Sequence, residues 1–509
     1  MKKPVFNYGV DNLTIDIALG LADGSIQGVL SDKAVQQIGK SQLYVDAIVE
    51  KEQTVYGINT GFGVLADTAI SAEDTKLLQY KILQSHSVGV GKNVPDNIAK
   101  LMMITKVHAL ARGYSGVRLE TIERIIWHID ENIIPEVPEK GSVGASGDLA
   151  PLAHLFLPLI GLGKCNGLPT SQLLLQYGLA PLEPGPKEGL ALINGTQFIL
   201  SFAVKGVQRL LNCLEAADII SAMSLEALTG TKAPFDERLH QLRPFHGTQL
   251  VAERLRLLLS GSEIMQSHID CGRVQDPYSL RCIPQVHGAS RNAWTHLKDL
   301  TETELNSVTD NPIIFDENTT ISGGNFHGQP LALPLDYACI AAAELGNISD
   351  RRCYLLLEGK WGLPMLLMKK VGLNSGFMIP QYTTAALVTE NKTHCFPASA
   401  DSIPTSLGQE DHVSMGSISA RKLHLVLDNL EYILAIELLT ACQAIEFRRP
   451  LKSSLLLEAA HDFVRSRVSF AEEDRVFSDD INKIQTMIHD QSFVRHVTEI
   501  ARTNGSPLP

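Results

Sequence analysis

Two long stretches of this chain lack the residues that end helices. Residues Thr196 to Leu228 contain one glycine and no proline, and residues Ser417 to Arg449 contain neither. Each stretch has 33 residues, so an unbroken helix over it would extend roughly 50 Å. Both stretches are apolar on more than one side, and such helices need several neighbours to bury them. The pattern predicts a mainly α fold with a long-helix bundle, and it favours an oligomer. Two shorter helices in each stretch are the alternative.

The predicted division of the chain follows from where the glycines and the long stretches lie. Residues 1–193 contain the glycine-rich loops and shorter periodic segments, whereas residues 194–509 contain both long stretches. We therefore expect a smaller N-terminal region of short helices and glycine-rich loops, followed by a long-helix bundle region. Strand patterns are confined to short pieces, near Leu13 to Ala18.

Two further helices are expected in the N-terminal region. Apolar residues recur with helical spacing between Ser31 and Glu52. Ser71 is followed three residues later by Asp74, which resembles the capping pattern that opens a helix.

Composition restricts the class of protein. Of 509 residues, 44% are hydrophobic and 20% are charged, which is typical of a globular protein with a large core. The formal charge of −12 argues against nucleic acid or an anionic membrane as a partner. No apolar run reaches the length of about 18 residues that spans a bilayer. The eight cysteines are scattered without a Cys-x-x-Cys pair, and the start lacks the apolar stretch of a secretory signal. We therefore expect reduced thiols and a cytoplasmic protein.

The triplet Ala145-Ser146-Gly147 can turn backbone into an electrophile. If the amide nitrogen of Gly147 attacks the carbonyl carbon of Ala145 and two waters leave, a five-membered imidazolone forms. It carries a methylidene group derived from Ser146. Gly147 has no Cβ to obstruct the attack, and Gly144 permits the strained backbone that such a closure needs.

Asp148 directly follows the triplet. Its carboxyl group is a candidate acid or base for the two dehydrations. It is also expected to cap a helix that runs from Leu149 to Leu162, which would place the positive end of the helix dipole beside the ring.

The twelve-residue block from Lys140 to Pro151 resembles the signature of the aromatic amino acid ammonia-lyases and aminomutases. The resemblance extends from about Asp46 to beyond Arg448, with further matching blocks at residues 310–312 and 372–378. It implies that the triplet forms a methylidene-imidazolone, that ammonia is eliminated without oxidation, and that no external cofactor is required. It also implies a homotetramer whose active sites use residues from more than one chain.

A glycine-rich loop begins at Tyr56. Three glycines among the eight residues Tyr56 to Gly63 suit a mobile lid over a bound amino acid. The loop resembles the tyrosine loop of the family, which implies that Tyr56 is the general base that removes the β-proton of the substrate.

The segment Gln275 to Arg281 combines a helix start with two functional side chains. Asp276 is expected to cap a helix with Pro277 in its first turn. Tyr278 and Arg281 are then three residues apart and share a face. An arginine fork matches a carboxylate, and the resemblance implies that Arg281 binds the substrate carboxylate. It also implies that Gln275 contacts the substrate and that Tyr278 reaches the electrophile.

Two other segments resemble family blocks. Asparagine beside glycine usually marks a turn, but the resemblance implies that Asn194 hydrogen-bonds the imidazolone oxygen, as in an oxyanion hole. It also implies that Phe326 packs on the ring. A purely structural role for Phe326 in the core is the alternative.

Substrate choice depends on two residues outside the general signature. Histidine-specific members of the family tend to carry Ser-His on one helix near the substrate ring, and this chain has Ser85-His86. The carboxylate of Glu410 could accept the imidazole N–H of a histidine substrate. Beside a phenyl ring the same carboxylate would stay unpaired at a cost of several kcal/mol. The sequence therefore predicts L-histidine as substrate, trans-urocanate as product and a role in histidine catabolism.

Three alternatives stay open. Tyrosine or phenylalanine ammonia-lyases and aminomutases share the same signature and differ mainly in substrate and product. A non-catalytic helical assembly protein is the alternative from another class. The sequence also leaves open whether the amine or the ring of the substrate attacks the electrophile. The histidines show no cluster at zinc-site spacing, so no metal is expected.

Overall fold

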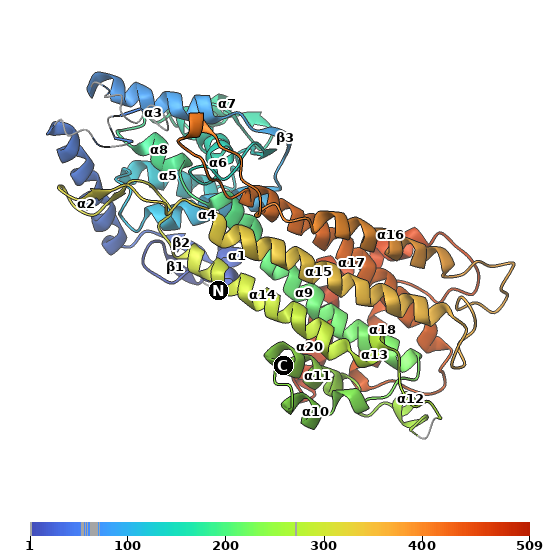
Figure 1. Ribbon diagram of the computed structural model, residues 1–509. Helices are drawn as coiled ribbons and strands as arrows, with labels where there is room; N and C mark the ends of the chain where they lie inside the picture. Colours follow the sequence, from blue (N-terminus) through green and yellow to red (C-terminus); the bar gives the residue numbers. More distant parts are fainter. Residues whose placement is uncertain are drawn as a thin grey trace. The chain divides into compact units, whose positions relative to one another are not determined.

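The computed structural model describes residues 3–51, 55, 57–58, 60–61, 70, 72–269 and 272–509. This part of the chain is mainly helical and forms two compact units (Figure 1). The first unit comprises Met1–Lys205, Leu297–Asp336 and Pro397–Arg421, and the second comprises Gly206–His296, Tyr337–Phe396 and Lys422–Pro509. The sequence-based division has a single border after Ile193, whereas each unit is formed by three separate stretches, because long helices carry the chain from one unit into the other.

The first unit contains short helices and pairs of very short strands. Its helices are α1 (Ile15–Asp23), α2 (Asp32–Glu50), α3 (Ala72–His86), α4 (Asp96–Leu110), α5 (Leu119–Asp130), α6 (Leu149–Phe156), α7 (Thr170–Gln176) and α8 (Glu188–Ile193), with 3₁₀ turns η2 (Leu157–Ile160) and η4 (Ser406–Gly408). Its strands are β1 (Val5–Asn7), β2 (Gln27–Val29), β3 (Val90–Asn93), β4 (Pro138–Lys140), β5 (Lys164–Cys165), β6 (Leu168–Pro169), β7 (Ile313–Ile314) and β8 (Thr320–Ile321). β1 pairs with β2 in parallel, and β3–β4, β5–β6 and β7–β8 are antiparallel pairs.

The second unit contains shorter helices beside parts of four long ones. The shorter ones are η3 (Ala233–Phe235), α10 (Glu237–Gln241), α11 (His246–Leu258), α12 (Glu263–Gln266), α13 (Tyr278–Arg281), α16 (Met378–His394), α18 (Leu455–Arg465), α19 (Phe477–His489) and α20 (Ser492–Thr503). The long helices are α9 (Gln197–Ala227), α14 (Ile283–Leu305), α15 (Gln329–Leu357) and α17 (Gly416–Glu446), and each contributes residues to both units.

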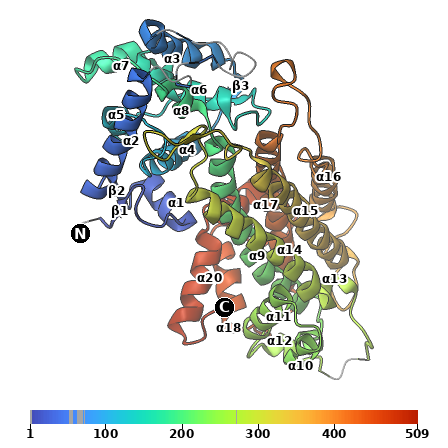
Figure 2. The same cartoon turned by 60° about the vertical axis from the view of Figure 1, so that its left-hand side comes forward.

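The two predicted long helices are confirmed. α9 and α17 each run for 31 residues without a break. The one glycine of α9 has a packing reason, since a Cβ at Gly206 would lie 2.8 Å from a methyl carbon of Leu423 on α17. The two helices therefore approach closely within the second unit, where the long helices lie side by side (Figures 1 and 2).

A buried carboxylate on α17 ties the long helices of the second unit together. Glu437 accepts hydrogen bonds from the hydroxyls of Ser224 on α9 at 2.7 Å and Ser349 on α15 at 2.5 Å. The guanidinium of Arg352, also on α15, holds both carboxylate oxygens at 2.5 and 2.9 Å. All four side chains are buried, so this polar group is accommodated because every partner is present.

The predicted strand near Leu13 to Ala18 is wrong. The chain forms helix α1 there, which begins after Thr14, whose hydroxyl accepts the N–H of Ile17 at 3.3 Å. Ile15, Ala18 and Leu21 are buried, and their spacing of three residues is a helical one. The alternation expected of a strand was too short to outweigh this pattern.

The predicted helix from Ser31 is confirmed as α2. The hydroxyl of Ser31 accepts the N–H of Ala34 at 3.4 Å and thereby caps the helix. α3 begins at Ala72, and Ser71, its predicted cap, lies outside the described residues.

Among the described residues, α15 is long and apolar enough to pass the length and composition test for a membrane span. Most of its apolar window is buried within the protein, which is the environment of a core helix.

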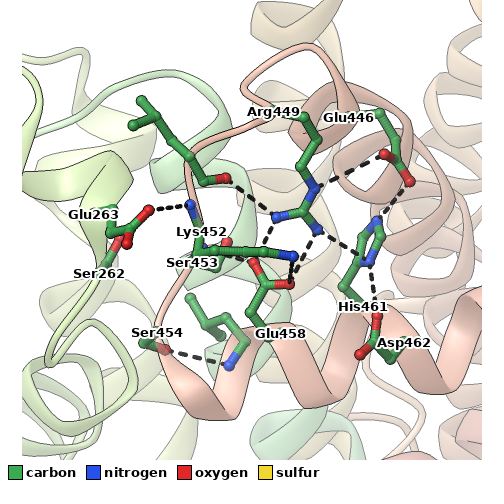
Figure 3. A network of polar contacts seen from close by, with 12 residues as sticks. Ser262, Glu263, Glu446, Arg449, Lys452, Ser453, Ser454, Glu458, His461 and Asp462 are labelled. Atoms are coloured by element: carbon green, nitrogen blue, oxygen red, sulfur yellow. Dashed lines mark hydrogen bonds and ion pairs between the residues drawn. The ribbon is translucent and has the colours of Figure 1, made fainter.

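A polar network surrounds Arg449, between the ends of α17 and α18 (Figure 3). Its guanidinium binds Glu458 through two hydrogen bonds of 2.6 and 3.1 Å. Glu446 lies 3.9 Å from the same guanidinium and also pairs with His461 at 3.0 Å. Two acidic groups thus share one arginine at a turn of the second unit.

Candidate active site

The Ala145-Ser146-Gly147 triplet lies in a strained loop between β4 and α6. Ser146 has φ +49° and Gly147 has φ +85°, and the first of these values is unusual for a residue with a side chain. A Cβ at Gly147 would lie 2.1 Å from the carbonyl oxygen of Gly195. Only glycine fits at this position, as the sequence analysis expected from the chemistry.

One wall of the loop is the turn that follows α8. The N–H of Gly195 donates to the carbonyl oxygen of Ser146 at 3.1 Å, and the N–H of Asp148 donates to the carbonyl oxygen of Gly195 at 2.8 Å. These two bonds form a short parallel bridge between Gly147 and Gly195. The backbone of the triplet is thereby held against a second backbone segment.

The start of α17 and the segment before it form a second wall. The N–H of Met415 donates to the carbonyl oxygen of Val143 at 3.0 Å, and the hydroxyl of Ser417 donates to that of Ser142 at 2.7 Å. The side chain of Ala145 packs on Met415 in a small apolar cluster. The loop therefore has little freedom on either side, which suits a reaction that needs fixed backbone atoms.

Asp148 does not cap the helix for which it was predicted. It stands at the N-cap position of α6 but makes no side-chain capping bond there. Its Oδ2 instead accepts the N–H groups of Phe198 and Ile199 at 3.0 Å each, so the carboxylate caps α9. The predicted helix from Leu149 to Leu162 is also shorter, because α6 passes into a 3₁₀ turn that ends at Gly161.

Full burial raises the pKa of Asp148 to about 7, against the effect of its hydrogen bonds.

A cavity of about 230 Å³ lies beside the triplet, within the first unit. Its walls combine the triplet loop with α3, the start of α6 and the hairpin before α17: Ser85, His86, Val88, Gly141, Ser142, Val143, Ala145, Leu149, Ala150, Thr405 and Glu410. The fold therefore brings His86 and Glu410 to the same cavity as Ala145, although they are far apart in the sequence. A concave site with few polar groups is typical of small-molecule binding.

His86 and Glu410 are held in defined orientations. Ser85 Oγ and His86 Nδ1 are 3.0 Å apart and hydrogen-bonded. Burial lowers the pKa of His86, while a hydrogen bond of its ring to the backbone carbonyl of Ile82 and the charge of Glu410 act in the opposite direction. Thr405 donates its hydroxyl hydrogen to Glu410 Oε2 at 2.9 Å. Within the part of the chain that the structure describes, Oε1 of Glu410 has no hydrogen-bond partner, so it can accept from a ligand donor.

Asn194 lies in the turn whose backbone bonds the triplet. Its side chain is buried, and its Oδ1 has no hydrogen-bond partner among the described residues. An unpartnered acceptor needs a donor, and the imidazolone oxygen is itself an acceptor, so a bond to that oxygen would use the side-chain N–H group of Asn194. The tight approach at Gly147, where only glycine fits, and the buried amide of Asn194 in the turn that bonds Ser146 suit a methylidene-imidazolone formed from the triplet.

Other predicted residues are not part of the cavity wall. Phe326 is half-buried in the first unit and is absent from the lining. Tyr56 lies outside the described residues. Gln275, Tyr278 and Arg281 belong to the second unit.

The segment around Arg281 confirms one prediction and corrects another. The guanidinium carbon of Arg281 lies 4.5 Å from the ring centre of Tyr278, so the two side chains share a face as expected. Asp276 is not the helix cap, because the cap position of the short helix α13 is Pro277. The carboxylate of Asp276 instead accepts the N–H of Thr231 at 2.6 Å, so it joins two loops.

Two residues near the triplet and the cavity were not predicted from the sequence. Thr405 binds the carboxylate of Glu410, and only its position five residues before Glu410 hinted at a contact across a turn. Lys106 lies buried on α4, where it binds the carbonyl oxygen of Asn194 at 2.5 Å, and nothing in its local sequence indicated this. Across the described ranges, no group of three or more His, Cys, Asp or Glu side chains is arranged to hold a metal ion.

The fold and the loop that carries the triplet define a class of protein. The family model described as aromatic amino acid lyase matches residues 13–466, and the chain belongs to this family. It is 46% identical to the histidine ammonia-lyase of Natranaerobius thermophilus, over 94% of each chain. The crystal structure of histidine ammonia-lyase from Trypanosoma cruzi superposes with a TM-score of 0.89 at 42% identity, covering 97% of this chain and 95% of that one. Tyrosine aminomutase from Streptomyces globisporus superposes with a TM-score of 0.92 at 34% identity, covering 98% and 99%.

Proposed function

We propose that this protein is a histidine ammonia-lyase, which converts L-histidine to trans-urocanate and ammonia. The observation that carries the proposal is the cavity in which His86 and Glu410 face the same space as Ala145 of the triplet. The high identity with histidine ammonia-lyases over most of the chain supports the same substrate.

The proposed prosthetic group is a methylidene-imidazolone formed from Ala145, Ser146 and Gly147. When formed, it supplies an electrophile that activates the substrate for loss of ammonia. Asn194, which is buried in the turn that bonds the backbone of Ser146, is proposed to donate its side-chain N–H to the imidazolone oxygen. Phe326 is proposed to pack against the ring.

The imidazole of the substrate is proposed to lie between His86 and Glu410. The carboxylate of Glu410 can accept the ring N–H, because Thr405 bonds its Oε2 and no other described residue bonds its Oε1. The lowered pKa of His86 keeps its imidazole neutral near pH 7, so it does not repel a protonated substrate ring. A phenyl or phenol ring would leave the Glu410 carboxylate without this partner.

The remaining steps are assigned to residues outside the cavity wall. Arg281 is proposed to bind the substrate carboxylate, with Gln275 and Tyr278 beside it. Tyr56 is proposed to remove the β-proton as the C–N bond breaks, so that ammonia leaves with the electron pair of that bond and the alkene forms.

We also propose a cytoplasmic homotetramer in which the second unit of another chain completes each site. Tyr278 is 71% exposed, which is unusual for a functional aromatic residue and suits a surface that another chain covers.

Tyrosine or phenylalanine ammonia-lyase or aminomutase activity is the second candidate. This protein is similar to tyrosine aminomutase over nearly its whole chain, so the test includes L-tyrosine and L-phenylalanine as substrates. The products differ in ultraviolet absorbance, so each of the three amino acids can be assayed separately.

The test compares the wild-type protein with Ser146→Ala on L-histidine, L-tyrosine and L-phenylalanine. We expect urocanate from L-histidine, and loss of several orders of magnitude in Ser146→Ala, because only binding and base catalysis remain. Intact mass should show the wild-type chain lighter by two water molecules. Coumarate or cinnamate formed faster than urocanate would overturn the substrate, and a chain of full mass with normal activity would overturn the electrophile.

A further inference from the structure

Lys106 is a charged residue in the interior of the first unit. Its side chain projects from α4 and is 2% exposed. The ammonium group donates to the carbonyl oxygen of Ala191 at 2.9 Å and to that of Asn194 at 2.5 Å. Both acceptors belong to the end of α8 and the turn after it, where carbonyl oxygens lack partners within the helix.

Burying an ammonium group is costly, and an apolar residue would pack at such a position without this cost. The cost is visible in the pKa of Lys106, which burial lowers to about 7, while Asp310 and Asp148 raise it and Lys187 lowers it further. Asp310 is itself engaged by Lys187 at 2.5 Å. The direct partners of Lys106 are therefore these two carbonyl oxygens, and its function should follow from what they are bonded to.

The peptide that joins Asn194 to Gly195 connects Lys106 to the electrophile loop. Its carbonyl oxygen accepts from Lys106, and its N–H, at the opposite end of the same planar unit, donates to the carbonyl oxygen of Ser146 at 3.1 Å. A cation on the oxygen of a peptide draws electron density from its nitrogen, which makes the N–H a stronger donor. The carbonyl group of Ser146 belongs to the same peptide as the nitrogen of Gly147.

Ring closure depends on that nitrogen. The bond from Gly147 nitrogen to Ala145 carbon forms, and the oxygen of Ala145 leaves as water with the amide hydrogens of Ser146 and Gly147. The hydroxyl of Ser146 leaves as a second water with its Cα hydrogen. A strong donor on the carbonyl oxygen of Ser146 makes the N–H of Gly147 more acidic and holds the peptide in place.

We propose that Lys106 is a positioning residue for formation of the electrophile, acting through the Asn194–Gly195 peptide on the carbonyl oxygen of Ser146. This inference rests on the proposed methylidene-imidazolone. It assigns to a residue of α4, far in sequence from the triplet, a part in the closure of the ring.

The test measures the mass of the peptide that contains Ser146, in protein whose fold is verified by circular dichroism and hydrodynamic size. We expect the wild-type peptide to lack two waters. In newly synthesised Lys106→Met the rate at which the peptide loses its two waters should fall about tenfold or more, since bonds from charged donors are the strongest ones. Lys106→Arg, which keeps the charge, should restore part of the lost dehydration rate.

Two control variants on α4 separate this role from general destabilisation. Thr105→Val removes a buried hydroxyl whose partners among the described residues are carbonyl oxygens of its own helix, at 2.9 and 3.2 Å. Ile104→Ala removes buried apolar volume. Both should dehydrate at the wild-type rate once folded. If Lys106→Met does not fold, Lys106→Gln, which keeps a neutral donor, supplies the measurement.

The outcomes separate this inference from the proposed function. A wild-type peptide of full mass would contradict the proposed prosthetic group itself. A wild-type peptide lacking two waters, together with equally fast dehydration in folded Lys106→Met or Lys106→Gln, would overturn only the role of Lys106. Equal slowing in Ile104→Ala would also overturn it, because loss of stability alone would then explain the effect.

Discussion

The hydroxyl of Thr405 donates to Oε2 of Glu410 at 2.9 Å, and the backbones of the same two residues pair across the intervening turn, with Thr405 N to Glu410 O also 2.9 Å. One residue thus fixes both the main chain and the carboxylate of the other. Because Glu410 borders the cavity, this contact determines where its free oxygen can meet a ligand.

Thr405→Val should weaken binding of L-histidine. The variant keeps the shape of the side chain but removes the bond to the carboxylate, and a hydrogen bond to a charged group contributes about 1–3 kcal/mol. We expect KM to rise about fivefold or more with little change in kcat, because the reacting atoms are not touched. Steady-state kinetics check this, with Thr405→Ser as the control that keeps the hydroxyl. A lower kcat at unchanged KM would contradict the assignment.

Gly147→Ala should abolish formation of the electrophile. A Cβ at this position would lie 2.1 Å from the carbonyl oxygen of Gly195, and φ +85° disfavours any side chain. We expect the full chain mass and loss of activity. Gly167→Ala is the matched control, because Gly167 has φ +82° with open space around it. If Gly147→Ala lost two waters like the wild type, the close approach to Gly195 would have no role in ring closure.

The parts of the fold that the sequence predicts well are those governed by local rules. α9 and α17 were predictable because proline is missing from both stretches, so nothing interrupts the backbone hydrogen bonds. The shared face of Tyr278 and Arg281 follows from helical spacing alone. At Leu13 to Ala18 the prediction was wrong, because six residues are too few for the spacing of apolar residues to distinguish a strand from a helix.

The parts that could not be predicted depend on contacts between distant segments. Asp148 was assigned to the helix that follows it, but the free N–H groups it binds belong to Phe198 and Ile199, about fifty residues later. A sequence does not show which helix start lies nearest in space. For the same reason the contacts of Lys106 could not be predicted, because its acceptors are some ninety residues away in the sequence.

Arg449→Met should destabilise the second unit. Arg449 is 23% exposed and holds both oxygens of Glu458, and its loss leaves a partly buried carboxylate with fewer partners. We expect a loss of about 1–3 kcal/mol in the free energy of unfolding, seen as a lower midpoint of thermal unfolding. Arg238→Met is the control, because Arg238 pairs with Asp236 while 88% exposed, and exposed pairs contribute little. Equal midpoints of thermal unfolding for both variants would show that burial of the Arg449–Glu458 pair does not contribute to stability.

His108 should make the protein less stable as the pH falls from about 6.5 to 4. Its ring is buried on α4, and its Nδ1 accepts the N–H of Gly9 at 3.1 Å, which requires the neutral form. Burial, with a smaller effect of Arg112, lowers its pKa to about 4. In this pH range the unfolded chain binds a proton that the folded chain does not, so acidification favours unfolding by roughly 1 kcal/mol per pH unit. In His108→Gln the amide oxygen can accept the same N–H without titrating. Its midpoint of thermal unfolding should therefore fall less than that of the wild type between pH 7 and pH 5, and a difference between the two proteins that stays constant over this range would contradict the assignment.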